Sequence, residues 1–108
     1  MPQIPENPSL ANLQTYQHEI CQERGWDKTS DAETFLLFME EVGELAKAIR
    51  KKKKLYEEKA KAHISADLEG EFADVLSYLL ELANRFEVDL EKAYRDKEAE
   101  NSGRVWES

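Results

Sequence analysis

Residues 35–49 of this 108-residue chain read FLLFMEEVGELAKAI. The large apolar residues of this stretch recur at intervals of three and four, which at about 100° per residue gathers them on one face of an α-helix. They are Phe35, Phe38, Val42, Leu45 and Ile49. The pattern predicts a long helix that turns this face toward the protein core, and the other segments are interpreted around it.

The same stretch carries three glutamates, Glu40, Glu41 and Glu44, within an arc of about 100° roughly opposite the centre of the apolar face. More apolar residues lie on or beside this acidic side, so the first half of the helix is apolar around most of its circumference. They are Leu36, Leu37 and Met39. Such a helix needs neighbours on two sides, and we expect another subunit to supply one of them.

A second acidic cluster lies in residues 71–74, which read EFAD. The surrounding pattern predicts a helix that begins at Ser65 or Asp67 and runs to about residue 86. Its apolar side is formed by Leu68, Phe72, Val75, Leu76, Leu79, Leu82, Ala83 and Phe86. Glu71 and Asp74 share an adjoining stripe with Asp67, Tyr78 and Glu81. We expect Glu71 and Asp74 to lie at the edge of the core and to face the glutamates of the preceding helix.

Local capping signals mark the starts of the helices. Ser9 can cap a first helix that ends at Gly25. Ser30 and Glu33 have the spacing of a capping box, so the helix over residues 35–49 begins at Ser30 or at the next residue. Asp89 is the expected N-cap of a last, fourth helix, which should end before residue 103.

The domain organisation is simple. Residues 1–8 hold all three prolines and are expected to form an extended arm, residues 9–104 one helical domain, and residues 105–108 a tail. A hinge or long connection is expected over residues 55–63, where the apolar pattern weakens. Because no segment alternates apolar and polar residues between hairpin turns, the sequence predicts an all-α fold.

Composition excludes several classes of protein. A formal charge of −8 and a pI near 4.8 argue against the basic surface that nucleic-acid binding needs. Cys21 is the single cysteine, so no disulfide can form within the chain. No stretch approaches the roughly 18 apolar residues of a membrane span. We expect a soluble, cytoplasmic protein that binds neither nucleic acid nor membrane.

The spacing of the carboxylates suggests a metal site. Acidic side chains three or four residues apart on a helix repel one another, and a hard divalent cation such as Mg²⁺ would offset that repulsion through oxygen ligands. The alternative is a solvated acidic surface. A di-iron carboxylate bundle would need Glu-x-x-His motifs, but neither His18 nor His63 follows a glutamate by three residues.

Three motifs give the chain a family resemblance. Residues 40–44 fit the pattern E-E-x-x-E, residues 71–74 fit E-x-x-D, and Lys97, Asn101 and Arg104 fit K-x-x-x-N-x-x-R. In this combination the chain resembles the MazG-like all-α nucleotide pyrophosphohydrolases, which are related to dimeric dUTPases and dCTP pyrophosphatases. The resemblance covers residues 35–106. It implies an antiparallel four-helix bundle that assembles as a homodimer or as a dimer of dimers, a homotetramer.

The resemblance also implies an activity and a ligand set. The expected reaction is Mg²⁺-dependent cleavage of a (d)NTP between the α and β phosphates by water, with Mn²⁺ as a possible substitute for Mg²⁺. It yields a nucleoside monophosphate and pyrophosphate and would serve nucleotide-pool sanitation. Glu41, Glu44, Glu71 and Asp74 correspond to the metal ligands. Glu40 either joins them or orients and deprotonates the attacking water, so Glu40 and Glu41 are the expected catalytic residues.

Substrate contacts follow from the third motif. Lys97 and Arg104 would bind phosphates, and Asn101 would bond base, sugar or phosphate. Trp26 is a candidate to stack on the base, whereas Trp106, near the end of the chain, is more simply a tail residue. Two alternatives stay open: pyrophosphate release from a phosphoribosyl-nucleotide, and a non-catalytic helical interaction module.

Overall fold

The computed structural model describes residues 2–53 and 67–103. These residues form α1 (Leu10–Arg24), the short 3-10 helix η1 (Trp26–Lys28), α2 (Asp31–Lys52), α3 (Leu68–Arg85) and α4 (Leu90–Ser102), with no strand among them. The all-α prediction is confirmed for this part of the chain. The connection expected over residues 55–63, the alternative cap Ser65, and Arg104 with the tail lie outside the described residues.

The capping signals act as the sequence predicts. The Ser9 hydroxyl accepts a hydrogen bond from the Asn12 amide at 3.0 Å, and the Ser30 hydroxyl accepts one from the Glu33 amide at 3.1 Å. In return the Glu33 carboxylate accepts from the Ser30 amide at 2.9 Å, which completes the capping box of α2. Asp89 caps α4 through the amide three residues further on. The starts of α1, α2 and α4 are therefore fixed by residues next to them in the chain. Asp67 occupies the N-cap position of α3, but its side chain makes no cap hydrogen bond there.

Gly25 ends α1 in the left-handed conformation, with φ of 72°. Its amide donates to the carbonyls of Cys21 and Gln22, which otherwise would have no partner at the end of the helix. Any other residue would bring its Cβ too close to the backbone in this conformation, at a cost of about 1–2 kcal/mol. Directly after Gly25 the chain enters η1, which occupies the expected connection to α2.

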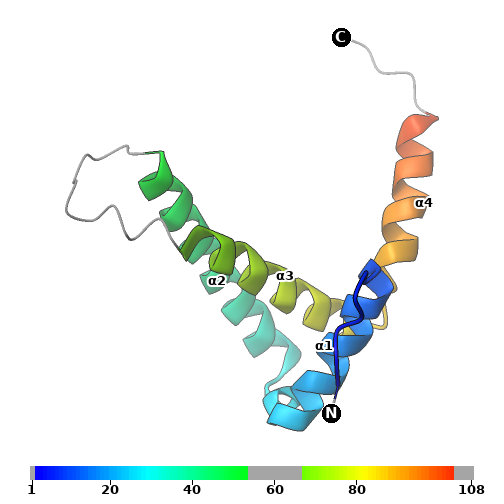
Figure 1. The fold of residues 1–108 in the computed structure, drawn as a ribbon, viewed down its shortest axis with the longest axis horizontal. Coiled ribbons are helices and arrows are strands. Elements are labelled where there is room, and N and C mark those ends of the chain that lie inside the picture. Colours follow the sequence, from blue (N-terminus) through cyan, green and yellow to red (C-terminus); the bar gives the residue numbers. More distant parts are fainter. Residues whose placement is uncertain (1, 54–66, 104–108) are drawn as a thin grey trace.

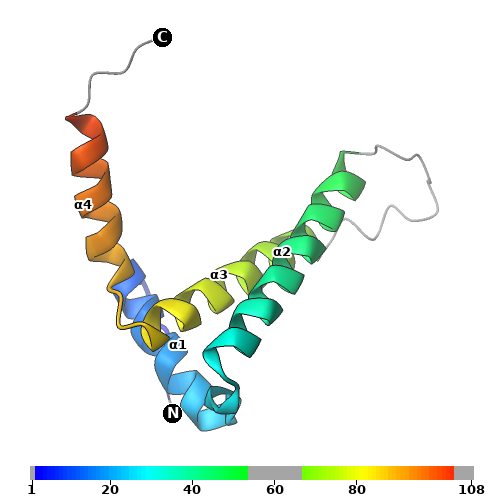
Figure 2. The ribbon, with the colours of Figure 1, turned by 180° about the vertical axis from the view of Figure 1, so that it is seen from behind.

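Helices α2 and α3 lie side by side and run in opposite directions along most of their length (Figures 1 and 2). Helix α1 packs against α3 near the end where α2 begins, and α4 contacts α1 and points away from the α2–α3 pair. The single chain does not show the expected closed four-helix bundle. No helix in residues 2–53 or 67–103 has the length and apolarity that crossing a bilayer requires.

The direction of α4 is set by a buried side chain of α1. Gln14 donates a hydrogen bond through Nε2 to the carbonyl of Val88 and accepts one through Oε1 from the Leu90 amide at 3.0 Å. The Asn84 side chain donates to the Gln14 carbonyl at 3.0 Å. The turn between α3 and α4 is thus attached to α1 by polar contacts that leave no backbone group of the turn unpaired at these positions.

The face that α2 turns toward α3 differs from the predicted face. Its buried and half-buried positions up to residue 50 are 34, 37, 38, 41, 42, 45 and 48. The buried face therefore keeps Phe38, Val42 and Leu45 of the predicted stripe, as expected, but is shifted by roughly 60° toward Thr34, Leu37 and Glu41. The core prediction is therefore wrong for Phe35 and Ile49, which are 51% and 42% exposed. Glu41, expected on the opposite side, lies on the face that meets α3. Because α2 is apolar on two sides, its sequence alone does not select the side that α3 covers.

Part of the predicted core of α3 is also exposed in the single chain. Leu68, Val75, Leu82 and Ala83 are buried or half-buried as expected. The other predicted core residues of α3, however, lie on its uncovered side: these are Phe72, Leu76, Leu79 and Phe86. The first half of α2 exposes Phe35, Leu36 and Met39 as well. We call these seven residues the uncovered apolar face. A soluble monomer rarely exposes this much large apolar side chain.

Candidate functional site

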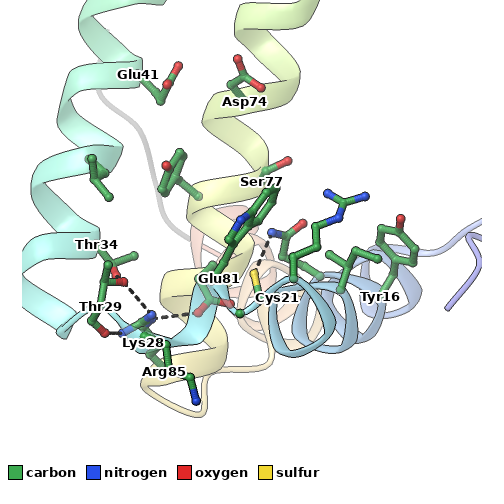
Figure 3. A pocket seen from close by; sticks show the side chains of 17 residues that line it. Tyr16, Cys21, Lys28, Thr29, Thr34, Glu41, Asp74, Ser77, Glu81 and Arg85 are labelled. Atoms are coloured by element: carbon green, nitrogen blue, oxygen red, sulfur yellow. Dashed lines mark hydrogen bonds and ion pairs between the residues drawn. The ribbon is translucent and has the colours of Figure 1, made fainter. Parts of the chain in front are cut away.

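Three carboxylates meet between α2 and α3. Glu41 comes from α2, while Glu71 and Asp74 stand one turn apart on α3. One oxygen from each lies within 4.8 Å of the other two. Figure 3 shows Glu41 and Asp74 on the facing sides of the two helices. The expectation that the acids of α3 face the glutamates of α2 is therefore met by Glu41.

The electrostatics of this group favour a bound cation. Burial, followed by the charges of Asp74, Glu71, Glu44 and Glu40, raises the pKa of Glu41 above the usual glutamate range. Burial and the neighbouring carboxylates raise the pKa of Glu71 in the same way. One oxygen of Glu71, Oε2, is buried and has no hydrogen-bond partner within the described part of the chain. An orphaned oxygen among like charges fits a hard divalent cation, because the ion would satisfy the oxygen and offset the repulsion.

The other two predicted acids lie beside this group. Glu44 and Glu40 are exposed and do not belong to the set of three oxygens within 4.8 Å. Their charges nevertheless act on it: Glu44 raises the pKa of both Glu41 and Glu71, and Glu40 raises that of Glu41. Both are thus close enough to change the pKa values of the site. The role of Glu44 as a ligand and that of Glu40 as a base or further ligand stay predictions.

A pocket of about 580 Å³ opens next to the carboxylates. Glu41 and Asp74 lie at one end of it, and Glu81 and Arg85 lie at the other (Figure 3). Its size is in the range that holds a small organic molecule. Burial and the charges of Glu41 and Asp74 raise the pKa of Tyr78, which also lines the pocket, so its hydroxyl stays protonated and able to donate.

Trp26 lines the same pocket from η1. The Arg24 guanidinium lies over its ring, 4.8 Å from the ring centre, in a cation–π contact. The indole is thus held in a defined place at the rim, in the same pocket as Glu41 and Asp74. This placement is compatible with stacking of Trp26 on a base, which stays a prediction.

The residues of the third motif are not brought to the carboxylates within one chain. Lys97 and Asn101 lie on α4, which points away from the α2–α3 pair (Figures 1 and 2). The Lys97 ammonium lies 3.6 Å from the Glu100 carboxylate, an exposed pair on the same helix. Arg104 is outside the described residues. The sequence motifs therefore group Lys97 and Asn101 with the carboxylates, whereas the single chain holds the two sets on different helices.

Other residues that line the pocket escaped the sequence interpretation. Tyr78 and Glu81 belonged to the stripe that carries Glu71 and Asp74, so their place beside the site could have been read from helical spacing. Arg85 and Thr29 gave no such signal. An arginine at the end of a helix is usually explained by the helix dipole, and its partner here is 56 residues away in the chain.

Comparison with known proteins identifies the family of the chain. The model of the MazG nucleotide pyrophosphohydrolase domain matches residues 30–99, which is more than half of the chain. This chain belongs to the MazG nucleotide pyrophosphohydrolase family. The match contains all five predicted acids and Lys97, and it ends before Asn101 and Arg104 and begins after Trp26. No curated protein matches the chain at a significant level.

Proposed function

We propose that this protein is a Mg²⁺-dependent nucleoside triphosphate pyrophosphohydrolase that cleaves the bond between the α and β phosphates. The products would be a nucleoside monophosphate and pyrophosphate, and the role would be sanitation of the (d)NTP pool. The approach of Glu41, Glu71 and Asp74 to within 4.8 Å, beside a pocket of suitable size, carries the proposal in a chain of this family.

The acidic residues would have two roles, metal binding and activation of the attacking water. Glu41, Glu44, Glu71 and Asp74 would hold the metal, and Mn²⁺ should be able to replace Mg²⁺ because both accept carboxylate oxygens. When bound, the divalent ion would offset the charge of the triphosphate and polarise the scissile phosphorus. Glu40 would orient the attacking water and accept its proton, or serve as a further ligand.

The pocket suggests how the substrate lies. The triphosphate would occupy the end formed by Glu41 and Asp74, and the nucleoside would extend toward Trp26. With one face of the indole covered by Arg24, the opposite face is the one available for stacking on a base. The protonated Tyr78 hydroxyl could donate to a phosphate or sugar oxygen within the same pocket.

A homo-oligomer would complete the site. The uncovered apolar face of α2 and α3 is what a second copy of the chain would bury, with a homodimer as the minimum and a dimer of dimers as the larger possibility. Because α4 leaves the α2–α3 pair, we propose that Lys97 and Asn101 reach the carboxylates of another subunit. Arg104 would join them there as a phosphate ligand.

Incubation of the purified protein with a panel of nucleotides and Mg²⁺ tests the activity. The panel should contain canonical and damaged (d)NTPs and a phosphoribosyl-nucleotide, with monophosphate and pyrophosphate measured separately. Release of pyrophosphate from the phosphoribosyl compound alone would favour the first alternative. No product from any compound, together with no rise in melting temperature on adding Mg²⁺, would instead favour a non-catalytic interaction module.

A further inference from the structure

Helices α2 and α3 are joined at two levels that differ in charge. At the upper level Glu41 faces Asp74, and the carboxylates have no cation paired with them in any contact found among the described residues. Seven residues away on each helix, or roughly 10.5 Å along the axis, Thr34 and Glu81 form the lower level. Both are buried. Here the acid is paired with a cation and the level is densely hydrogen-bonded.

Arg85 makes the contacts of the lower level. Its Nε donates to the Glu81 carboxylate at 2.9 Å, and its Nη1 donates to the Thr29 carbonyl at 2.6 Å and to Asp31 at 3.2 Å. Its Nη2 donates to the Thr29 hydroxyl at 3.1 Å. One guanidinium thus joins α3 to the connection before α2 and to the first residue of α2 (Figure 3).

Two hydroxyls carry this contact into α2. The Thr29 and Thr34 hydroxyls lie 2.8 Å apart, and the Thr34 hydroxyl donates to the Ser30 carbonyl at 2.9 Å. Because each hydroxyl has one proton, the Thr29 hydroxyl must donate to Thr34 while it accepts from Arg85. The chain of hydrogen bonds therefore has one direction, from the guanidinium through both hydroxyls to the backbone of α2.

Arg85 is unsuited to bind substrate phosphate itself. Its four contacts use most of its five N–H donors, and its charge is matched by Glu81 and Asp31. Its side chain is 12% exposed. Although it lines the pocket, it has little capacity left for a ligand, so its contacts serve to hold the two helices.

We propose that Arg85 is a positioning residue for the metal site, acting through Thr29 and Thr34 to fix the spacing and register of α2 against α3. Carboxylates that repel one another at the upper level would push the helices apart. The hydrogen bonds of the Arg85 guanidinium at the lower level resist that movement, so Glu41, Glu71 and Asp74 stay close enough to bind one ion. This inference rests on the proposed metal site, and the experiment that tests it measures metal binding directly.

The test measures Mn²⁺ binding to the full chain without nucleotide, by calorimetry or by the free-ion signal in electron paramagnetic resonance. Arg85→Lys keeps a cation beside Glu81 but removes the planar guanidinium that bonds several acceptors at once. Thr29→Val removes one hydroxyl at nearly constant volume. We expect Arg85→Lys to weaken Mn²⁺ binding by about 10-fold to 100-fold, the range seen when the support of metal ligands is lost. Thr29→Val should weaken it by less, in the same direction.

A matched control is Lys92→Met, which removes an exposed ion pair with Asp96 on α4, a helix that carries none of the proposed metal ligands. It should bind Mn²⁺ with wild-type affinity. The melting temperature should also rise less on adding Mn²⁺ in Arg85→Lys than in wild type, whereas a purely structural role would lower both melting temperatures equally. If Arg85→Lys does not fold, Thr29→Val carries the test.

The outcomes separate the inference from the function on which it rests. Wild-type affinity for Mn²⁺ in a folded Arg85→Lys or Thr29→Val variant would overturn the positioning role and leave the metal site intact. A wild-type protein that binds no Mn²⁺ would overturn the metal site and with it the inference. Weaker binding in both variants, with an unchanged control, would support the proposal.

Discussion

Glu41 and Asp74 lie on antiparallel helices with carboxylate oxygens within 4.8 Å of each other, and Glu71 joins them. Like charges at this distance destabilise the metal-free protein, and the repulsion contributes to the raised pKa of Glu41. A protein keeps such an arrangement when the charge serves a ligand. The proposals about activity and about Arg85 both depend on this pair.

Replacing one acid should stabilise the metal-free protein and remove its function. In Asp74→Asn the repulsion on Glu41 falls, so the urea midpoint in EDTA should rise. Loss of a ligand should lower pyrophosphate release by at least about 100-fold, the upper end of what weaker support of a ligand costs. Glu19→Gln, which removes an exposed carboxylate of α1 outside the pocket, is the matched control and should keep full activity.

The metal-free protein should lose stability as the pH rises above 4.5, the ordinary glutamate value. The pKa values of Glu41 and Glu71 are raised, so the folded chain holds protons that the unfolded chain releases. Their stabilisation is complete below the unfolded-state value and is lost as the pH passes the folded-state values. Urea unfolding in EDTA from about pH 4 to 7 measures the fall. The Glu41→Gln, Glu71→Gln double variant should lack it, and an equal fall in both proteins would contradict the prediction.

A charge on the uncovered apolar face should break the assembly. Leu36 is 63% exposed and Phe72 is 54% exposed in the single chain, so Leu36→Lys and Phe72→Lys should fold but lose the interface. Light scattering should show a dimer or larger species for wild type and a monomer for the variants. Gln22→Lys places the same charge on an exposed site of α1 and should leave the assembly unchanged. A monomeric wild-type protein at micromolar concentration would refute the oligomer.

Subunit mixing tests whether α4 serves another subunit. Lys97→Gln and Asp74→Asn should each be strongly impaired alone, because one loses a phosphate contact and the other a metal ligand. When the two are dissociated together and reassembled, mixed dimers with contacts between subunits contain one intact site. About a quarter of wild-type activity should return, since half of the randomly formed dimers are mixed and each has one working site of two. No recovery would place Lys97 in the site of its own chain.

The thiol of Cys21 should react slowly. Burial, followed by the charge of Glu81, raises its pKa from 9.0 to about 11. At a pH below both values the thiolate fraction is then about 100-fold lower than for an ordinary thiol, and the thiolate is the reacting form. Titration with a chromogenic disulfide should show slow labelling in the native protein and fast labelling in urea. Fast labelling of the folded chain would contradict this environment.

Local signals in the sequence account for the starts of α1, α2 and α4 and for the end of α1. Ser9, Ser30 and Asp89 each bond to an amide three residues away, and Gly25 ends α1 through carbonyls of the preceding turn. These contacts need nothing outside their own segment, so the sequence predicts them. The acid motifs were found in the same way, because the spacing of Glu71 and Asp74 on one helix is a local property.

The tertiary structure decided which surfaces meet. Helix α2 is apolar on two sides, and only the docking of α3 placed Glu41 in the contact and left Phe35 exposed. Arg85 bonds to Thr29, which lies 56 residues away in the chain. The contact of α1 with the α3–α4 turn sets the direction of α4. Short-range hydrogen bonds fix the ends of helices, whereas the choice among alternative apolar faces depends on the free energy of packing the whole chain. The sequence determined the helices and their acidic motifs, and the fold decided which carboxylates meet.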